Sequence, residues 1–488
     1  MPWIVEGHEQ TGSKNPSIPY TFILIIMLCM MGISMNILTS SFTITRYHSY
    51  GNGSDYYTLY DFDGESILSN VTLKRRSYLS NSEKSSLLLA LHIGSLLSII
   101  PVAALYKRFG FTRSLSLSMC LCIITSLLLP VLSDTQLFSL AFIVRVVQGA
   151  SLGTFLPIIS KVGSYLSIHH FTINTVILLG YLNLSAFFLF PISAILSVST
   201  LGWHSVHYFF AAVLFILLIV FLSYHRSESF QRILRQARLF ELFYGTMNEH
   251  RSSNMLTFNL PYVSIYQDIA VWGTFIGAFG YLSALQLNME YMPIFFYKVV
   301  GLAAIPSSFV CSIPLLISFI ISLLASMRIP PIPFVSSPLH KMRVYNSLSS
   351  LLPGFLFIAI ATFQPSVYPL LTIFLHVIAT SFLGFAGGGF IHAIRLRSAH
   401  FSIFIIANLH ALCSVAALFV TLLAIIISRD EEYSEWPSLF IIQGVVLIVS
   451  NVFFCLLGTD QQAEWTKKGY EDTSFDPRRV DSLPQRPL

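Results

Sequence analysis

Long apolar segments dominate this chain and recur twelve times along it. A helix needs roughly 20 predominantly apolar residues to cross a bilayer. Backbone N–H and C=O groups in lipid must bond within their own segment, so runs of this length predict helices. Hydrophobic residues make up 54% of the chain and charged residues 10%, well below the roughly 25% charged residues of soluble domains. We therefore predict an all-α, multi-pass integral membrane protein embedded in a lipid bilayer.

The predicted spans are separated by short polar or Pro- and Gly-containing breaks. They are Tyr20–Ile44, Ser85–Tyr106, Ser114–Ser133, Gln136–Ser160, Asn174–Ser197, Val206–Tyr224, Ile269–Tyr297, Pro306–Met327, Ser347–Phe363, Tyr368–Ile391, Ser402–Ile427 and Pro437–Gly458. The longest internal break, 225–268, divides them six and six. This division predicts two pseudo-symmetric six-helix halves, 20–224 and 269–458, around a site at the membrane midplane.

Lys and Arg residues are unevenly distributed between the two sets of predicted loops. Cytoplasmic loops carry the excess of these residues, which places the tails 1–19 and 459–488 and the linker 225–268 in the cytoplasm. The first loop on the opposite side, about 45–84, holds two glycosylation sequons, at Asn52 and Asn70. We expect both to be glycosylated in this luminal or extracellular loop. A third sequon, at Asn183, lies inside a span and should stay unused.

Five motifs occur in a characteristic order along the chain. The turn after the second span is basic and Gly-containing, and a Gly turn with fixed cations can lock one helix pair against neighbouring helix ends. The alternative is an ordinary positive-inside loop. The residues of this predicted cytoplasmic signature loop are Gly94, Pro101, Lys107, Arg108, Gly110 and Arg113. The other motifs are Arg145–Gly153, Pro191–Ser193, Gly387–Phe390, and Trp436–Phe440 with Gly458–Gln461 and Trp465.

In order and spacing these motifs resemble the anion:cation symporter family of the major facilitator superfamily. That family includes the vesicular glutamate transporters, sialin and the sodium–phosphate cotransporters. The resemblance covers roughly Tyr20 to Trp465. It implies a twelve-helix major facilitator fold and transport of an organic or inorganic anion, driven by protons, sodium or membrane potential.

The chain departs from the family pattern at charged positions. Ser34 stands where many members have an arginine, although the following Asn36 is retained. Leu152 replaces a glutamate that the family links to proton coupling, and Tyr281 falls near an arginine of the glutamate transporters. The resemblance therefore implies the scaffold, and leaves the substrate and the coupling ion open.

Two charged residues lie inside predicted spans, and such residues are functional candidates because they are costly there, at about 2.5–3.5 kcal/mol each. Arg145 and Glu290 both fall in the outer halves of their spans. We expect them to pair across a shared cavity, where an anionic substrate could compete for Arg145. The alternatives are a structural ion pair that holds the halves together, or a Glu290 side chain that reaches the lumen.

Four uncharged polar or titratable residues complete the candidate set. His92 could shuttle a proton, since the free pKa of histidine lies near neutrality; the alternative is a neutral imidazole bonded to a carbonyl. Gln148 and Asn36 could line a polar path for the substrate, or hydrogen-bond between packed helices. Tyr281 could donate a hydrogen bond to a substrate, or cover a cavity that is less charged than is usual in the family.

Several function classes are disfavoured by the sequence. It contains no GxxxxGK[ST] nucleotide-binding loop, no candidate catalytic triad and no metal cluster. We therefore expect neither an enzyme nor an ATP-driven pump. The formal charge of +5 is spread over many loops, which reflects membrane topology rather than a nucleic-acid partner.

The favoured function is secondary active transport of a small organic anion or phosphate by alternating access. We expect no cofactor other than H⁺ or Na⁺ as a coupling ion, and a small-molecule substrate as the partner. The alternatives are a neutral-solute transporter, by uniport or proton-linked, and a non-transporting protein that keeps the fold. The host is the plasma membrane or an endolysosomal or vesicular membrane, and the oligomeric state stays open.

Overall fold

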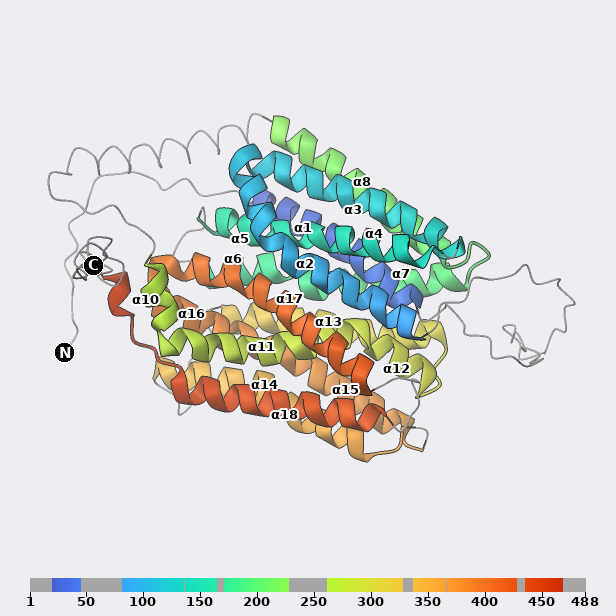
Figure 1. The fold of residues 1–488 in the computed structure, drawn as a ribbon. Helices are drawn as coiled ribbons and strands as arrows, with labels where there is room; N and C mark the ends of the chain where they lie inside the picture. Colours follow the sequence, from blue (N-terminus) through green and yellow to red (C-terminus); the bar gives the residue numbers. More distant parts are fainter. Residues whose placement is uncertain are drawn as a thin grey trace, which may run out of the picture.

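The helices of this protein lie side by side along one common direction (Figure 1). The structure, a computed structural model, describes residues 20–44, 81–135, 137–164, 171–227, 261–327, 337–365, 367–427 and 435–467. Within these ranges, 12 helical segments are long and apolar enough to cross a membrane. The predicted all-α membrane class and the number of spans are therefore confirmed. The sequons at Asn52 and Asn70, like most of the predicted linker, lie outside the described residues.

The first six spans form one group of helices, which we call the N half. The fourth and fifth spans are each interrupted, by a short 3₁₀ turn and at Gly180 respectively. The helices are α1 (Tyr20–Ile44), α2 (Asn81–Phe109), α3 (Phe111–Asp134), α4 (Phe138–Ala150), η1 (Ser151–Thr154), α5 (Phe155–Ser164), α6 (Phe171–Leu179), α7 (Tyr181–Val198) and α8 (His204–Arg226).

The last six spans form the second group, which we call the C half. They are α10 (Tyr262–Gln267), α11 (Ile269–Glu290), α12 (Met292–Lys298), α13 (Ala304–Ser326), α14 (Pro338–Thr362), α15 (Pro369–Phe382), η3 (Leu383–Gly387), α16 (Phe390–Ser398), η4 (Ala399–Phe401), α17 (Ser402–Ile427), α18 (Trp436–Leu457) and η5 (Glu464–Thr466). In Figure 1 the blue to green N half lies beside the yellow to red C half. We name the two ends of the bundle the α10 end and the α12 end.

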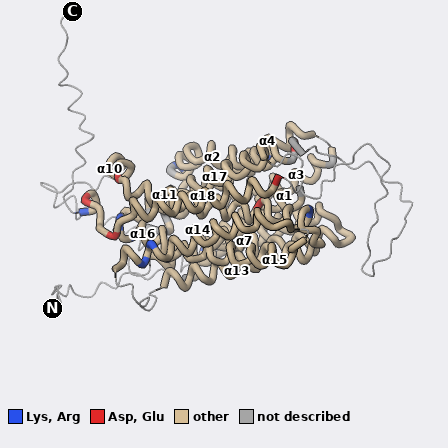
Figure 2. Tube along the Cα trace, turned by 90° about the horizontal axis from the view of Figure 1, so that it is seen from below, with Lys and Arg blue, Asp and Glu red and all other residues tan. Residues whose placement is uncertain are grey.

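Contacts between the halves come from a few helices. α7 packs on α13, and α17 packs on both α2 and α5. Most of the length of each helix carries uncharged residues, and the charged positions gather mainly near the ends of the bundle (Figure 2). This distribution follows from the cost of charge in lipid, and it makes the few buried charges informative.

Two helices extend beyond their predicted ends. α14 begins at Pro338, well before the predicted Ser347, and α16 continues to Ser398. The added turns of α14 include Lys341 and Arg343. Hydropathy reports where the apolar layer ends, while backbone hydrogen bonding continues the helix through charged residues outside that layer.

The predicted signature loop is almost entirely helical. α2 ends at Phe109 and α3 begins at Phe111, so Gly110 alone makes the turn, with φ of 79°. This left-handed conformation favours glycine because a Cβ atom would be strained there. Lys107 falls in the last turn of α2, and Arg108 and Arg113 lie on either side of Gly110.

Gly94 and Pro101 are inside α2 rather than in the turn. A Cβ atom on Gly94 would overlap the carbonyl of Val146 in α4, and one on Gly149 would overlap the carbonyl of Leu91 in α2. These two glycines therefore bring α2 and α4 into backbone contact, as small residues do in membrane helix pairs. The prediction that Gly94 and Pro101 belong to the loop was wrong.

Candidate functional site

The candidate residues lie in three separate places. Arg145, Gln148 and Asn36 form a polar group inside the N half, which we call the N-half cluster. His92 and Glu290 meet across the two halves, and Tyr281 lines a small cavity between them. The three places differ in which helices they join, and this difference separates their roles.

The N-half cluster is centred on the fully buried guanidinium of Arg145. Its Nη1 donates to Gln148 Oε1 at 2.6 Å and to the carbonyl of Ile37 at 3.3 Å. Its Nε donates to the carbonyl of Leu87 at 3.3 Å. Arg145 and Gln148 stand three residues apart on α4 and so share one face. Arg145 therefore ties α4 to α1 and α2 through backbone carbonyls.

Asn36 and Gln148 continue the same network. The Gln148 Nε2 donates to Ser126 Oγ on α3 at 3.0 Å and to the carbonyl of Asn36 at 3.4 Å. The Asn36 Nδ2 donates to the carbonyls of Gly32 and of Phe210 in α8, each at 2.9 Å. These hydrogen bonds join helices of the N half to one another, so this half can move as one body without breaking them.

Glu290 and His92 form a contact between the halves. The His92 Nε2 in α2 lies 2.8 Å from Oε1 of Glu290, the last residue of α11. Thr421 in α17 donates to Glu290 Oε2 at 3.3 Å. His92 is 3% exposed and Glu290 1% exposed, so water does not screen the contact. We call His92, Glu290 and Thr421 the inter-half bridge.

The predicted partner of Glu290 was therefore wrong. The sequence predicts a pair between Glu290 and Arg145, whereas in the structure the imidazole of His92 lies against the carboxylate. Arg145 faces carbonyls of α1 and α2 within the N half. The depth of each residue along its span contains no information on which face of its helix the residue occupies.

Helix α17 carries further polar contacts to the N half. The Ser414 and Ser95 hydroxyls lie 2.7 Å apart, between α17 and α2. The Tyr181 hydroxyl in α7 lies 3.2 Å from His410 Nδ1 in α17. Together with the inter-half bridge, these pairs follow the interface along much of α17. They must break if the halves separate along this helix.

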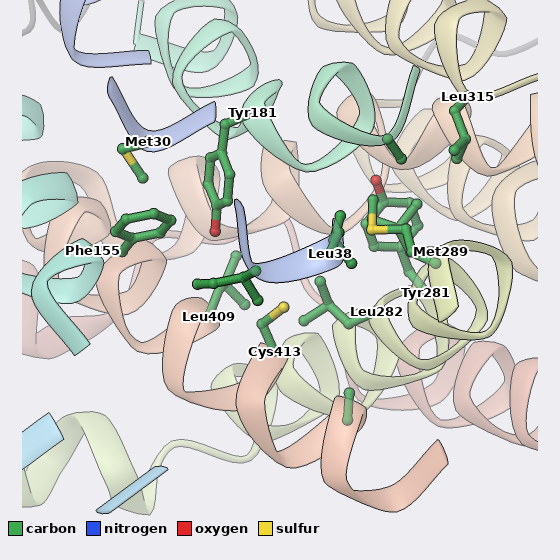
Figure 3. Packing of buried hydrophobic residues seen from close by; sticks show 14 of the residues in the cluster. Met30, Leu38, Phe155, Tyr181, Tyr281, Leu282, Met289, Leu315, Leu409 and Cys413 are labelled. Carbon is green, nitrogen blue, oxygen red and sulfur yellow. The ribbon is translucent and has the colours of Figure 1, made fainter. Parts of the chain in front are cut away.

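A small cavity of about 40 Å³ lies between the halves at the break between α6 and α7. Figure 3 shows Tyr181, Leu409, Cys413, Leu282 and Tyr281 grouped there. None of the described residues lining it is Asp, Glu, Lys or Arg. The lining comprises Val176, Leu179, Gly180, Tyr181, Leu182, Asn183, Tyr281, Leu282, Phe319, Ser322, Phe390, Ile391, Leu409, His410 and Cys413. We call it the central cavity.

Of the predicted site residues whose side chains the structure describes, Tyr281 alone lines the central cavity. Asn183, which the sequence marks only as an unused sequon, also reaches this cavity beside Tyr281. Its Oδ1 is buried without a hydrogen-bond partner. The sequence signal that could have identified Asn183 is a polar residue inside an apolar run. Thr421 and Ser414 in α17 carry the same signal.

A second polar cluster ties the C half together at the α10 end. Asp268 caps α11 by accepting from the Ala270 N–H at 2.9 Å. Its Oδ2 accepts from Arg397 Nε at 2.8 Å and from Trp465 Nε1 at 3.0 Å. Arg397 also donates to the Gln461 carbonyl at 3.1 Å. The segment after α18, which includes the predicted Trp465 motif, is thereby fastened to α11 and α16.

Solved structures with a similar fold are membrane transporters. A D-xylose–proton symporter matches with a TM-score of 0.62 and 13% identity, over 89% of this chain and 97% of that one. A POT family transporter in complex with 5-aminolevulinic acid matches with a TM-score of 0.56 and 16% identity, over 90% and 96%. At these identities the likeness shows the fold alone.

Similar sequences are transporters as well. An uncharacterised transporter of Caenorhabditis elegans, slc-17.3, is 22% identical over 77% of this chain and 70% of its own length. The human sodium-dependent phosphate transport protein 1 is 20% identical over 86% and 88%. The model of the Major Facilitator Superfamily matches residues 22–403. Since this match covers most of the chain, the protein belongs to the Major Facilitator Superfamily of membrane transporters.

Proposed function

We propose that this protein is a proton-coupled secondary active transporter that carries a small organic anion or phosphate by alternating access. The inter-half bridge is the observation that carries the coupling part of the proposal. It holds two titratable side chains at 2.8 Å, one from each half, out of contact with water. Intramembrane carboxylates and histidines of this kind act as proton relays in transporters.

The physical reason is the change in environment that rocking imposes. While the halves are together, the His92 Nε2 and the Glu290 Oε1 lie 2.8 Å apart. When the halves separate, the Glu290 carboxylate loses this contact, and a bound proton would take the place of the lost neighbour. Proton binding at Glu290 thereby favours one arrangement of the halves over the other, which links proton movement to alternating access.

The central cavity supports a cargo that is neutral overall. Burying an unpaired charge is costly, and the described lining carries no Asp, Glu, Lys or Arg. An anion that enters together with one proton meets this condition. The name of the human relative, a sodium-dependent phosphate transport protein, supports an anion as the cargo. A neutral solute also meets the condition, so it is the second candidate.

The proposal is tested by uptake into proteoliposomes under imposed proton, sodium or potential gradients. A panel of phosphate, glutamate, urate, sialic acid, monocarboxylates and sugars is offered to the wild type and to Glu290→Gln. We expect proton-driven uptake of one anion, lost in the variant and retained in Glu464→Gln, since Glu464 is exposed. Proton-driven uptake of an uncharged sugar would instead establish the second candidate. Uptake that ignores all gradients would contradict the coupling.

We also propose the predicted orientation, with both tails and the linker 225–268 in the cytoplasm. The test is glycosylation of the loop about 45–84 in a eukaryotic host. We expect the protein to migrate faster on a gel after glycosidase treatment, and the shift to disappear in the double variant Asn52→Gln, Asn70→Gln. A shift that persists in that variant would place the glycan elsewhere.

A further inference from the structure

Asn183 presents an amide oxygen without a hydrogen-bond partner to the central cavity, beside Tyr281. The residue is 4% exposed, and its Oδ1 has no hydrogen-bond partner. A buried amide oxygen without a partner costs roughly 1–3 kcal/mol, so such groups in native proteins call for an explanation. The amide end offers an acceptor and two donors. A ligand that matches it must therefore offer a hydrogen-bond donor and an acceptor side by side.

The rest of the cavity is mostly apolar. Leu182, Leu282 and Leu409 contribute aliphatic surface, and Phe319 and Phe390 contribute rings. Gly180 brings α7 close to Phe319 of α13, since a Cβ atom there would overlap that ring. The lining is thus mostly apolar, with the Asn183 amide beside the side chains of Tyr181, Tyr281 and His410. Such a surrounding favours a ligand with an apolar body and one carboxyl group.

We propose that the central cavity, enlarged from its present volume of about 40 Å³ when the halves part, binds a small monocarboxylic acid in its protonated form, with the carboxyl group paired to the amide of Asn183. The acid O–H donates to Oδ1 and the acid carbonyl accepts from Nδ2, while the apolar body faces the leucine and phenylalanine side chains. This inference rests on the proposed proton-coupled function, because the bound neutral acid is the anion together with its proton.

The lining disfavours the more highly charged members of the anion class. Glutamate would bring two carboxylates and an ammonium group, and phosphate at neutral pH carries a net negative charge. No described lining residue provides a fixed countercharge, and an uncompensated buried charge is heavily penalised. The titratable groups around the cavity are Tyr181, Tyr281, His410 and Cys413, and the Nδ1 of His410 is within reach of the Tyr181 hydroxyl.

Binding to the purified full-length protein is the first test, since neutral acids cross bilayers unaided and blur uptake. The probes are benzoate and butyrate, with benzamide as a non-ionising mimic of the protonated carboxyl group. Between about pH 7.5 and pH 5.5 the neutral fraction of such acids rises about tenfold per unit. We expect the apparent affinity for benzoate to rise by up to about 100-fold over this range, and that for benzamide to stay constant. Equal affinity for benzoate at both pH values would overturn the proposal.

Variants show whether the pH dependence of binding comes from protonation of the ligand or from protonation of the protein. Asn183→Leu should weaken benzamide and benzoate binding at least roughly tenfold, through loss of two hydrogen bonds. Asn174→Leu is the matched control: Asn174 lies in α6 of the same span, is buried with an equally unpartnered Oδ1, and does not line the cavity. The pH dependence should persist in His410→Gln. If the affinity of His410→Gln for benzoate did not change with pH, the pH dependence would come from His410, and the proposal would be overturned.

The two proposals fail in different ways. If phosphate or another panel solute enters under a proton gradient while no monocarboxylate or benzamide binds, the proposed function holds and this inference is wrong. If benzoate binds with the expected pH dependence while transport ignores all gradients, the inference holds and the coupling is wrong.

Discussion

The N-half cluster and the inter-half bridge are both buried and polar, yet they join different parts of the molecule. The N-half cluster connects α1, α2, α3, α4 and α8 within one half. The inter-half bridge connects α2 of one half to α11 and α17 of the other. In the proposed rocking of the halves, the first contacts would stay intact and the contact between His92 and Glu290 would break. A buried charged residue is therefore a candidate functional residue. Whether its partners lie in the same half or in the other half indicates its role.

The largest expected effect comes from removing the charge of the bridge. Glu290→Gln keeps the shape and the hydrogen bond to Thr421 but cannot exchange a proton. We expect proton-driven uptake to fall to the level of protein-free vesicles, while exchange of substrate between equal concentrations continues, because exchange needs no net proton movement. Loss of both activities, with folding intact, would mean that Glu290 supports the site rather than the coupling.

Arg145 should affect stability more than coupling. Arg145→Ala removes the donor to the Gln148 amide oxygen, together with the second hydrogen bonds to the Ile37 and Leu87 carbonyls, which keep their helical N–H partners. Each buried group left unsatisfied costs about 1–3 kcal/mol. We expect a clearly lower melting temperature in detergent than for Glu290→Gln. We expect the Arg145→Ala molecules that remain folded to retain proton-driven uptake. An Arg145→Ala protein of normal stability that takes up no solute would return Arg145 to the substrate site.

A double-mutant cycle measures the difference between the two regions directly. His92→Gln and Glu290→Gln remove partners that touch, so their effects on stability should be non-additive, by roughly 0.5–3 kcal/mol. Gln148→Leu and Glu290→Gln belong to separate networks and should add within about 0.3–0.5 kcal/mol. Comparable interaction energies in the two cycles would contradict the assignment of Glu290 to a bridge separate from the N-half cluster.

The sequence predicted the spans well because apolar length depends on local composition alone. It also identified Arg145 and Glu290, because charge inside an apolar run is visible without a structure. It could not predict that His92 rather than Arg145 meets Glu290, since that depends on the rotation of α2, α4 and α11 about their axes. Asn183 was missed for the same reason: an uncharged amide in an apolar run gains significance only when the fold shows that it lacks a partner and lines a cavity.

The smallest expected effect concerns the pair of hydroxyls at 2.7 Å between Ser95 and Ser414. Ser414→Ala removes one hydrogen bond between the halves, whose net contribution is about 0.5–1.5 kcal/mol. If the bond exists only while α2 and α17 touch, its loss should shift the ratio of separated to closed molecules by about two- to tenfold. Distances between spin labels on exposed positions of α3 and α14 would report this ratio. Ser98→Ala is the control, because the Ser98 hydroxyl donates to the Ser95 carbonyl within α2. An unchanged ratio in Ser414→Ala would mean that α2 and α17 stay in contact throughout the transport cycle, and that the halves pivot on this helix pair.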